Sequence, residues 1–197
     1  MRVAAHGSAI EIRLLEEKHA EELFQLIEAN RASLRQWLPW LDWSNSPADT
    51  AEHIRLSQSR YRESNGFAAG IWIDNQLAGS IGLHTIDSRH RSSSIGYWLS
   101  EQFRGRGAMT RACWAVVNTG FEYYRLHRIE IRCATGNQKS CAVARRLGFI
   151  YEGTLREAEW LYDHFVDLAV YSMLEQDWSR LAGSDLTGSQ QPGPPPA

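Results

Sequence analysis

Residues 104–107, with the sequence Arg-Gly-Arg-Gly, combine the residue types and the spacing that suit anion binding. They follow an apolar run at 95–99 and lead directly into a long helical pattern that begins at Ala108. Two glycines separated by one residue let the backbone turn sharply, so that successive N–H groups can converge on one anion without interference from a Cβ atom. The segment therefore predicts a phosphate-binding turn.

The expected helix start strengthens this prediction. The first N–H groups of a helix have no partner inside the helix, and the positive end of the helix dipole lies at the same place. A pyrophosphate group suits such a position. The alternative is a glycine-rich turn between a strand and a helix that binds nothing.

The same residues resemble a known protein family. The run Arg-Gly-Arg-Gly-Ala-Met at 104–109 resembles the acyl-CoA pyrophosphate loop of the GNAT acetyltransferase superfamily, written Arg/Gln-x-x-Gly-x-Gly/Ala. The runs Asn-Gln-Lys-Ser at 137–140 and Leu-Gly-Phe at 147–149 resemble the second cofactor segment of the family. Met109 stands where the broad pattern has Gly or Ala, and Met is common at this position in one branch of the family.

That branch acetylates the N-termini of ribosomal proteins. The runs Ile-Gly-Tyr-Trp-Leu at 95–99, Met-Thr at 109–110 and Glu-Ala-Glu-Trp-Leu at 157–161 resemble it, and the similarity covers residues 10–178. The resemblance implies the α/β GNAT fold, a single mixed and mostly antiparallel sheet with helices on both faces. In that fold two parallel strands splay apart, and the pantetheine arm of the cofactor lies between them.

The implied reaction is direct transfer of acetyl from acetyl-CoA to a primary amine, and it needs a base and an acid. The resemblance assigns Glu159 as the base, acting through an ordered water, and Ser140 as the acid that protonates the thiolate. An α-amine with a pKa of about 8 is about a quarter neutral at pH 7.5, whereas lysine is neutral to only about one part in a thousand, so an N-terminal amine asks little of its base. The alternatives are that Glu159 is a solvated loop carboxylate beside Glu157 and that Ser140 only stabilises a helix start.

The resemblance also implies a set of cofactor-binding residues. Backbone N–H groups at Trp98 and Leu99 are expected to hold the thioester carbonyl, and Asn137 is expected to cap a helix and to contact pantetheine. The full expected set is Trp98, Leu99, Arg104, Gly105, Arg106, Gly107, Ala108, Met109, Thr110 and Asn137. No metal is expected.

Three residues are candidates for the acceptor side. Trp37 and Trp40 belong to a tryptophan-rich connection, together with Trp43, at the place where this fold has its substrate wall. Large aromatic rings there suit a peptide N-terminus or a hydrophobic amine. His84 is expected at a strand end that faces the substrate. Packing at the edge of the core for the tryptophans, and a structural role for His84, are the alternatives.

The elements that must position these residues follow from periodicity and turn signals. An apolar alternation at 128–133 after the long helix predicts a strand that lies parallel to the strand at 93–99, because a helix joins the two. Ser46 and Asn137 are expected to cap helices. The other expected elements are strands at 11–15, 67–73 and 76–86, helices at 18–29 and from Pro47, and a closing hairpin of 149–156 with 166–174.

Composition limits the classes of function. With 197 residues and 43% hydrophobic content, the chain suits one packed domain. Basic residues outnumber acidic ones severalfold between 88 and 147, which suits a phosphorylated cofactor, while a net charge of −2 argues against nucleic acid as a partner. Three cysteines without ligand spacing argue against structural zinc and predict a reducing compartment, although a basic setting leaves Cys141 open as a reactive thiol.

These observations predict an N-terminal extension at 1–9, a GNAT domain at 10–181 and a disordered Gly/Pro/Ser-rich tail at 182–197. No signal peptide or membrane-spanning run is expected, which predicts a cytoplasmic protein without a membrane partner. The first hypothesis is an acetyltransferase for a protein N-terminus. The alternatives are an acetyltransferase for a small amine, such as an antibiotic, aminoacyl nucleotide or polyamine, and a CoA-binding module without turnover. The oligomeric state is open, with a homodimer as one option.

Overall fold

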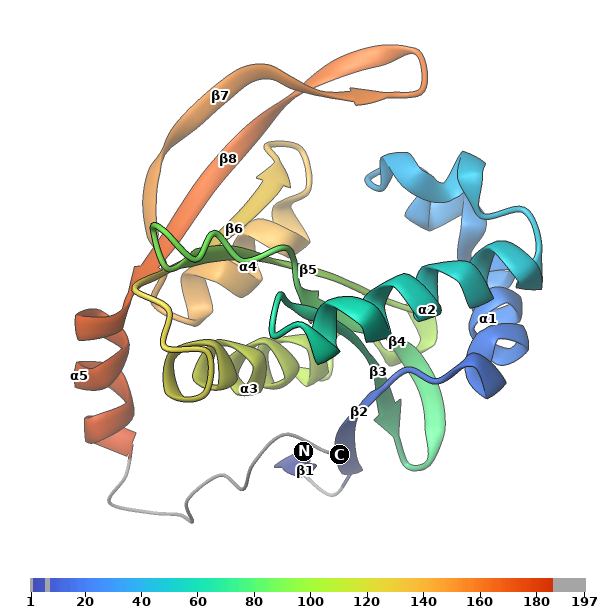
Figure 1. The fold of residues 1–197 in the computed structure, drawn as a ribbon. Helices are drawn as coiled ribbons and strands as arrows, with labels where there is room; N and C mark the ends of the chain where they lie inside the picture. The colour runs from blue at the N-terminus through green and yellow to red at the C-terminus, as the bar shows by residue number, and fades with distance from the viewer. Residues whose placement is uncertain (1, 6–7, 186–197) are drawn as a thin grey trace.

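The structure is a computed structural model that describes residues 2–5 and 8–185. Within these residues, eight strands form one sheet in the order β1-β2-β3-β4-β5-β6-β8-β7 (Figure 1). The strands are β1 (Arg2–Ala5), β2 (Ser8–Leu14), β3 (Phe67–Ile73), β4 (Gln76–Leu83), β5 (Ser92–Leu99), β6 (Arg128–Ala134), β7 (Ile150–Leu161) and β8 (His164–Leu174). The sheet is antiparallel except between β5 and β6, which are parallel as the sequence predicts.

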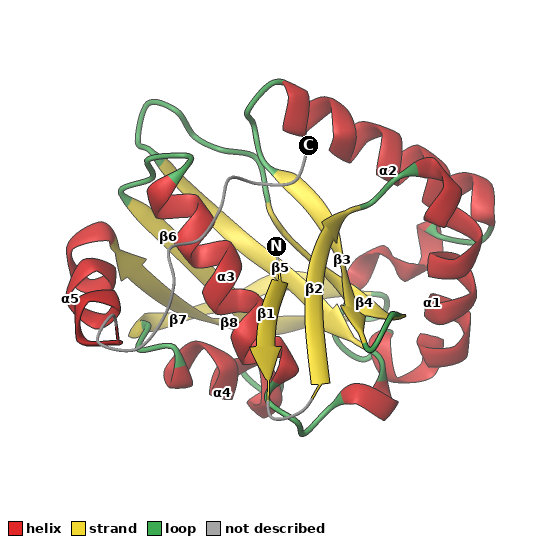
Figure 2. Cartoon of the chain, turned by 90° about the horizontal axis from the view of Figure 1, so that it is seen from below, coloured by secondary structure: helices red, strands yellow, loops and turns green. Residues whose placement is uncertain are grey.

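Helices cover both faces of the sheet (Figure 2). They are α1 (Ala20–Leu34), α2 (Pro47–Arg62), α3 (Ala108–Glu122), α4 (Gln138–Arg146) and α5 (Glu175–Asp185), with 3-10 turns η1 (Glu17–His19), η2 (Pro39–Trp43) and η3 (Glu101–Phe103). Within the described part of the chain, no helix has the combination of length and apolar character that crossing a bilayer requires.

Side-chain alternation along the strands divides the core into two clusters. On β3, Ile71 and Ile73 face the cluster that contains α3, while Trp72 faces the cluster under α1 and α2. Successive side chains of a strand point to opposite faces, so one apolar strand serves both layers. The predicted caps are confirmed: Ser46 Oγ accepts from Asp49 N at the start of α2, and Asn137 Oδ1 accepts from Ser140 N at the start of α4.

Several predicted bounds differ from the structure. The N-terminal extension includes a strand, since β1 pairs with β2, which begins at Ser8. The last hairpin is much longer than expected, reaching Leu161 on β7 and starting at His164 on β8. Most side chains along β7 are exposed, so the sequence offered little buried alternation to mark its length. The helix α5 continues beyond the predicted tail boundary at 182 to Asp185, and residues 186–197 of that tail lie outside the described residues.

Trp178 explains why this C-terminal helix docks. Its side chain is 2% exposed, and its ring lies 5.3 Å from Trp114 and 6.1 Å from Phe121, both on α3. The indole Nε1 donates to Asn118 Oδ1 at 3.3 Å. One buried aromatic residue thus ties α5 to the main core.

Candidate active site

The turn before α3 exposes its backbone. Gly105 and Gly107 have φ angles of +80° and +73°, which L side chains rarely adopt. A Cβ at Gly105 would meet nothing within 4 Å, and a Cβ at Gly107 would lie 3.8 Å from Arg111 Nη2 as its nearest contact. The two glycines therefore shape the turn and leave open space on the side from which a ligand would approach.

Donors and positive charge converge on that space. Among the described residues, the N–H groups from Gly105 to Thr110 donate to no protein acceptor, because the helix supplies none to its first turn. The guanidinium of Arg111 lies beside Gly107, the exposed Arg106 forms no ion pair within the described residues, and the first turn of α3 carries no acidic residue. These residues fit a pyrophosphate. Arg111, four residues after Gly107, was not predicted from the sequence, although its helical spacing could have indicated it.

Arg104 and Met109 have a different role from the one expected. Arg104 Nε donates to the Leu99 carbonyl at 3.0 Å, and Nη1 donates to Glu101 Oε1 at 3.2 Å, so the Arg104 side chain anchors the end of β5. Met109 packs against the main core, which explains why a large apolar residue is accepted at the sixth position of the loop. Ala108 is likewise buried. At these positions, the backbone is what remains available to a ligand.

The parallel strands β5 and β6 separate beside this turn. In the described sheet their register runs from Ser92–Arg128 to Ser94–Glu130, although β5 continues to Leu99 and β6 continues to Ala134. On the other side of β5, Ser94 O accepts from His84 N and Ser100 N donates to Ala78 O. Because hydrogen-bonding direction alternates along a strand, the even-numbered residues bond to β4 and the odd-numbered ones face the gap.

This alternation corrects one expectation. The N–H of Trp98 faces β4, and its side chain packs with the α1/α2 cluster, so Trp98 does not offer a donor to the gap. The N–H groups of Leu99 and Tyr97 do. Leu99 remains a candidate donor to a thioester carbonyl, and Tyr97 joins it.

Ser140 lies in the first turn of α4 and faces this gap. Its hydroxyl does not cap the helix, because Asn137 Oδ1 accepts from Ser140 N at 3.1 Å. Instead, Ser140 Oγ lies 3.1 Å from Tyr97 Oη, which also lies 3.3 Å from the Ser140 carbonyl oxygen. Tyr97 was not predicted as a site residue. Its place on the splayed strand, two positions before Leu99, is the signal that could have found it.

Glu159 lies on β7, in the β7–β8 hairpin, which extends beyond the end of β6 (Figure 1). It pairs with Val166 on β8, directly after a register shift between Leu155 and Glu159. One residue further along β8, Asp167 O accepts from Thr135 N at 2.9 Å, at the loop that leads into α4. Glu159 is therefore at the level of the Ser140 helix start, and the sheet places the two candidate groups at the same end.

The environment of Glu159 differs from that of Glu157. Partial burial raises the pKa of the Glu159 carboxyl, and no charged neighbour contributes to the shift. Glu157 is exposed, has a φ of 47° and donates its backbone N–H to Asp167 Oδ1 at 2.7 Å. The half-buried carboxylate suits proton transfer better than a fully solvated one would.

The acceptor side is enclosed by the hairpin tip and the connection between α1 and α2. Tyr162 Oη donates to the Leu38 carbonyl, and the Arg35 guanidinium lies 3.7 Å from the centre of the Tyr162 ring. Trp37 lies over the β6–α4 loop, since a Cβ at Gly136 would be 3.5 Å from its ring. Trp40 packs against the α1/α2 cluster, so of the two predicted tryptophans Trp37 has the better placed ring.

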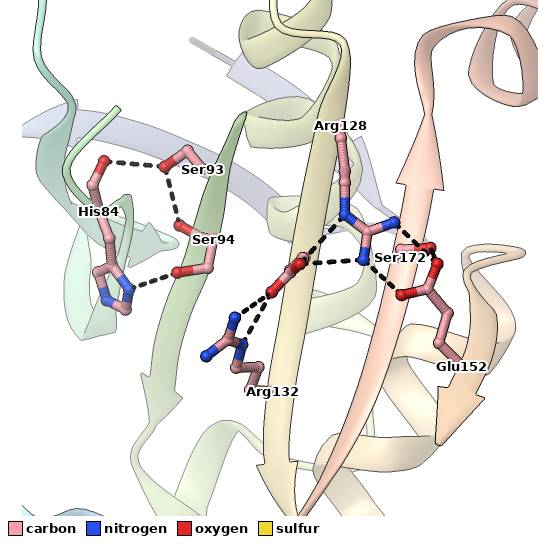
Figure 3. A network of polar contacts seen from close by, with 8 residues as sticks. His84, Ser93, Ser94, Arg128, Arg132, Glu152 and Ser172 are labelled. Carbon is pink, nitrogen blue, oxygen red and sulfur yellow. Dashed lines mark hydrogen bonds and ion pairs between the residues drawn. The ribbon is translucent and has the colours of Figure 1, made fainter. Parts of the chain in front are cut away.

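His84 lies opposite Ser94, at the point where the pairing of β5 with β6 ends (Figure 3). Its Nδ1 is 2.9 Å from Ser94 Oγ, its carbonyl accepts from Ser93 Oγ at 2.9 Å, and its ring covers Gly96. Desolvation and the charge of Arg60 lower its pKa, although part of the residue remains exposed. These contacts favour the structural role that the sequence left as an alternative.

The cysteines are buried. Cys133 Sγ and Cys141 Sγ are 3.2 Å apart as free thiols, and burial together with Cys141 raises the pKa of Cys133 to about 12. Cys141 is 2% exposed, which argues against the reactive thiol considered from the sequence. The site thus offers an anion-binding turn, free backbone donors, a hydroxyl pair and a half-buried carboxylate, a set that suits acyl transfer without a covalent enzyme intermediate.

Known proteins share this architecture. Residues 10–150 match the family model described as acetyltransferase (GNAT) domain. The chain is 40% identical over 171 residues to the putative ribosomal N-acetyltransferase YdaF of Bacillus subtilis (strain 168), covering 86% of this chain and 93% of that protein. It is 31% identical over 168 residues to the ribosomal-protein-serine acetyltransferase of Escherichia coli (strain K12), covering 85% and 94%. A solved structure of RimL, a ribosomal L7/L12 α-N-protein acetyltransferase in complex with coenzyme A, aligns with a TM-score of 0.84 at 29% identity, covering 90% of this chain and 99% of that one.

Proposed function

Because the chain belongs to the GNAT acetyltransferase family and is an acetyl-CoA-dependent N-acyltransferase, we propose that it acetylates the N-terminal α-amine of a ribosomal protein. An N-terminal Ser or Ala is the preferred first residue of the acceptor. The relatives named above support a protein acceptor, and the enclosed acceptor side described for Tyr162 and Trp37 is compatible with a chain end.

Acetyl-CoA supplies an activated acetyl group on a thioester. The turn at Gly105 and Gly107 binds the pyrophosphate through its free N–H groups, with Arg106 and Arg111 as counter-charges. Leu99 N–H stabilises the oxyanion that forms when the amine attacks the carbonyl carbon. These residues bind the pyrophosphate and polarise the thioester carbonyl, and none of them forms a covalent bond to the acetyl group.

Glu159 and Ser140 assist the two proton transfers of the reaction. The C–N bond forms and the C–S bond breaks, so the amine loses one proton and the sulfur gains one. Glu159 accepts the amine proton through a water, and Ser140 donates a hydrogen bond to the sulfur as negative charge develops there. Nitrogen loses one proton and sulfur gains one, and exchange with solvent water then returns Glu159 and Ser140 to their starting protonation states.

One observation carries the choice of an α-amine. Glu159 is a half-buried carboxyl whose pKa is raised by burial, and it forms no ion pair within the described residues. An α-amine with a pKa of about 8 is partly neutral near neutral pH and asks little of such a base, whereas a lysine side chain with a pKa of about 10.4 is almost wholly protonated.

The test is an acceptor screen that measures release of thiol from acetyl-CoA. We expect turnover with peptides that begin with Ser or Ala, and mass spectrometry should place the acetyl group on the α-amine. The same peptides with a blocked N-terminus and an internal lysine are the matched control. Turnover only with polyamines, aminoacyl nucleotides or antibiotics would replace the proposal by the small-amine alternative. Binding of CoA without turnover of any acceptor would support the remaining alternative, a CoA-binding module without catalytic activity.

A further inference from the structure

The side chain of Tyr97 bridges the open end of the β5–β6 pair, which is the part of the two strands beyond Ser94 and Glu130. Tyr97 belongs to β5, Ser140 belongs to α4, and their hydroxyl oxygens are 3.1 Å apart where the two strands no longer pair. Tyr97 packs against the main core, so its ring has little freedom to leave this position. The contact is the direct side-chain link from β5 to the candidate acid.

The hydroxyl of Tyr97 has one proton and two acceptors within reach. It can donate to the Ser140 carbonyl at 3.3 Å, and Ser140 Oγ then donates to Tyr97 Oη at 3.1 Å. It can instead donate to Ser140 Oγ, which frees the Ser140 proton for another acceptor. The Ser140 carbonyl lies inside α4, where it also accepts from the N–H four residues later. When the Tyr97 hydroxyl turns away from the Ser140 carbonyl, that carbonyl therefore still has a hydrogen-bond donor.

We propose that Tyr97 is a positioning residue for acetyl transfer: its hydroxyl donates to Ser140 Oγ and thereby leaves the Ser140 proton free for the sulfur that departs in the open end. The proposal rests on the proposed function. Tyr97 itself gives up no proton, so no proton is added to the balance of the reaction. In the other arrangement the Ser140 proton is directed at Tyr97 and is not available to the sulfur.

The surroundings keep Tyr97 in the donor form. Burial raises its pKa well above the usual value, and the thiols of Cys113, Cys133 and Cys141 add to the rise. A neutral phenol can act as a hydrogen-bond donor.

The test combines Tyr97→Phe with Ser140→Ala. Tyr97→Phe keeps the ring and removes the hydroxyl, so kcat should fall by about three- to tenfold, the usual value of one hydrogen bond, while KM for acetyl-CoA stays unchanged. In the Ser140→Ala background the same change should have no further effect. Tyr124→Phe is the matched control, because the buried Tyr124 hydroxyl has no partner among the described residues.

A second readout needs no turnover. Calorimetry should compare the affinity of the protein for CoA with its affinity for desulfo-CoA, which lacks the sulfur. We expect wild type and Tyr124→Phe to prefer CoA, and Tyr97→Phe and Ser140→Ala to lose the same part of that preference, about threefold for one hydrogen bond.

Three outcomes would overturn the proposal: unchanged kcat in Tyr97→Phe, an effect of equal size in the Ser140→Ala background, or a loss accounted for by a higher KM and a lower melting temperature than in Tyr124→Phe. Loss of activity in Ser140→Ala without loss in Tyr97→Phe would reject the role of Tyr97 and leave the proposed function intact. Failure of wild type to acetylate any N-terminus would reject the proposed function, and the desulfo-CoA comparison would still decide the role of Tyr97.

Discussion

The two ends of the β5–β6 pair, the closed end where the strands bond to each other and the open end where they separate, differ in backbone pairing and in neighbouring side chains. At the closed end, Ser92–Ser94 pair with Arg128–Glu130, and charged side chains connect β6 to its neighbours (Figure 3). Arg128 Nη1 donates to Glu152 Oε1 at 2.8 Å on β7, and its Nε donates to Glu130 Oε1 at 3.1 Å. At the open end the ladder stops, and the hydroxyls of Tyr97 and Ser140 and the odd-numbered N–H groups of β5 face the gap.

This contrast shows how one pair of strands can be both anchor and site. Ionic contacts fix the closed end, so the strands diverge from a defined point. Beyond it, the polar groups of β5 are unsatisfied by β6, and a buried unpaired donor is costly unless a ligand uses it.

The largest effect is expected from Gly107→Val at the open end. Its φ of +73° is unfavourable for a β-branched residue, and the new side chain would occupy the space beside the free N–H groups. CoA should no longer raise the melting temperature, and its affinity should fall at least about tenfold. Gly148→Ala, with a φ of +79° away from the loop, is the control for backbone strain and should keep the CoA-dependent rise. A normal rise in Gly107→Val would remove the loop from the binding site.

A change at the closed end should affect stability instead. Arg128→Met leaves Glu130 and Glu152 without their shared cation, so the free energy of unfolding should fall by about 1 to 3 kcal/mol, measured by denaturant unfolding. Arg132→Met is the control, because Arg132 is 52% exposed and bonds to Glu130 from the solvent side. CoA affinity well below the melting temperature should stay within about twofold of wild type. An equal loss in both variants would mean that Arg128 does not anchor this end.

The pH dependence of stability should report on the same ion pair. Hydrogen bonds from Arg128 and Ser172 lower the pKa of Glu152 from 4.5 to about 2. A carboxyl with a lowered folded-state pKa contributes stability above its unfolded value and loses it as pH falls. Wild type should therefore lose stability between pH 4.5 and 2, and Glu152→Gln should lose less, by under about 1 kcal/mol because the residue is partly exposed. Parallel pH curves for the two proteins would contradict this.

The smallest effect is expected at the acceptor side of the open end. Tyr162→Phe removes the hydrogen bond to the Leu38 carbonyl and keeps the ring against Arg35. KM for the acceptor peptide should rise by about two- to fivefold while KM for acetyl-CoA stays constant, since the contact holds the hairpin tip and not the cofactor loop. Tyr123→Phe, at the exposed C-cap of α3, is the control. A change in acetyl-CoA KM instead would place the hairpin contact in cofactor binding.

The sequence predicted the secondary-structure elements and helix caps better than the roles of the residues at the open end. Apolar alternation in β6 and the caps Ser46 and Asn137 are local signals, and the structure confirms them. The roles of Arg104, Trp98 and Tyr97 depend on which way a side chain or N–H turns after two strands separate, and no local pattern contains that direction. The length of β7 was missed for a similar reason, because pairing with β8 and not burial defines an exposed strand.

The central claim is that Glu159 serves as the base at the open end, and the pH–rate profile of Glu159→Gln tests it most directly. With an acceptor peptide that the wild type acetylates, kcat/KM should fall at least about tenfold near neutral pH, and the loss should shrink toward pH 9 as the α-amine becomes neutral unaided. Glu157→Gln, two residues away and exposed, should keep wild-type rates. Full activity of Glu159→Gln from pH 6.5 to 9 would contradict the account and leave Glu159 a surface carboxylate.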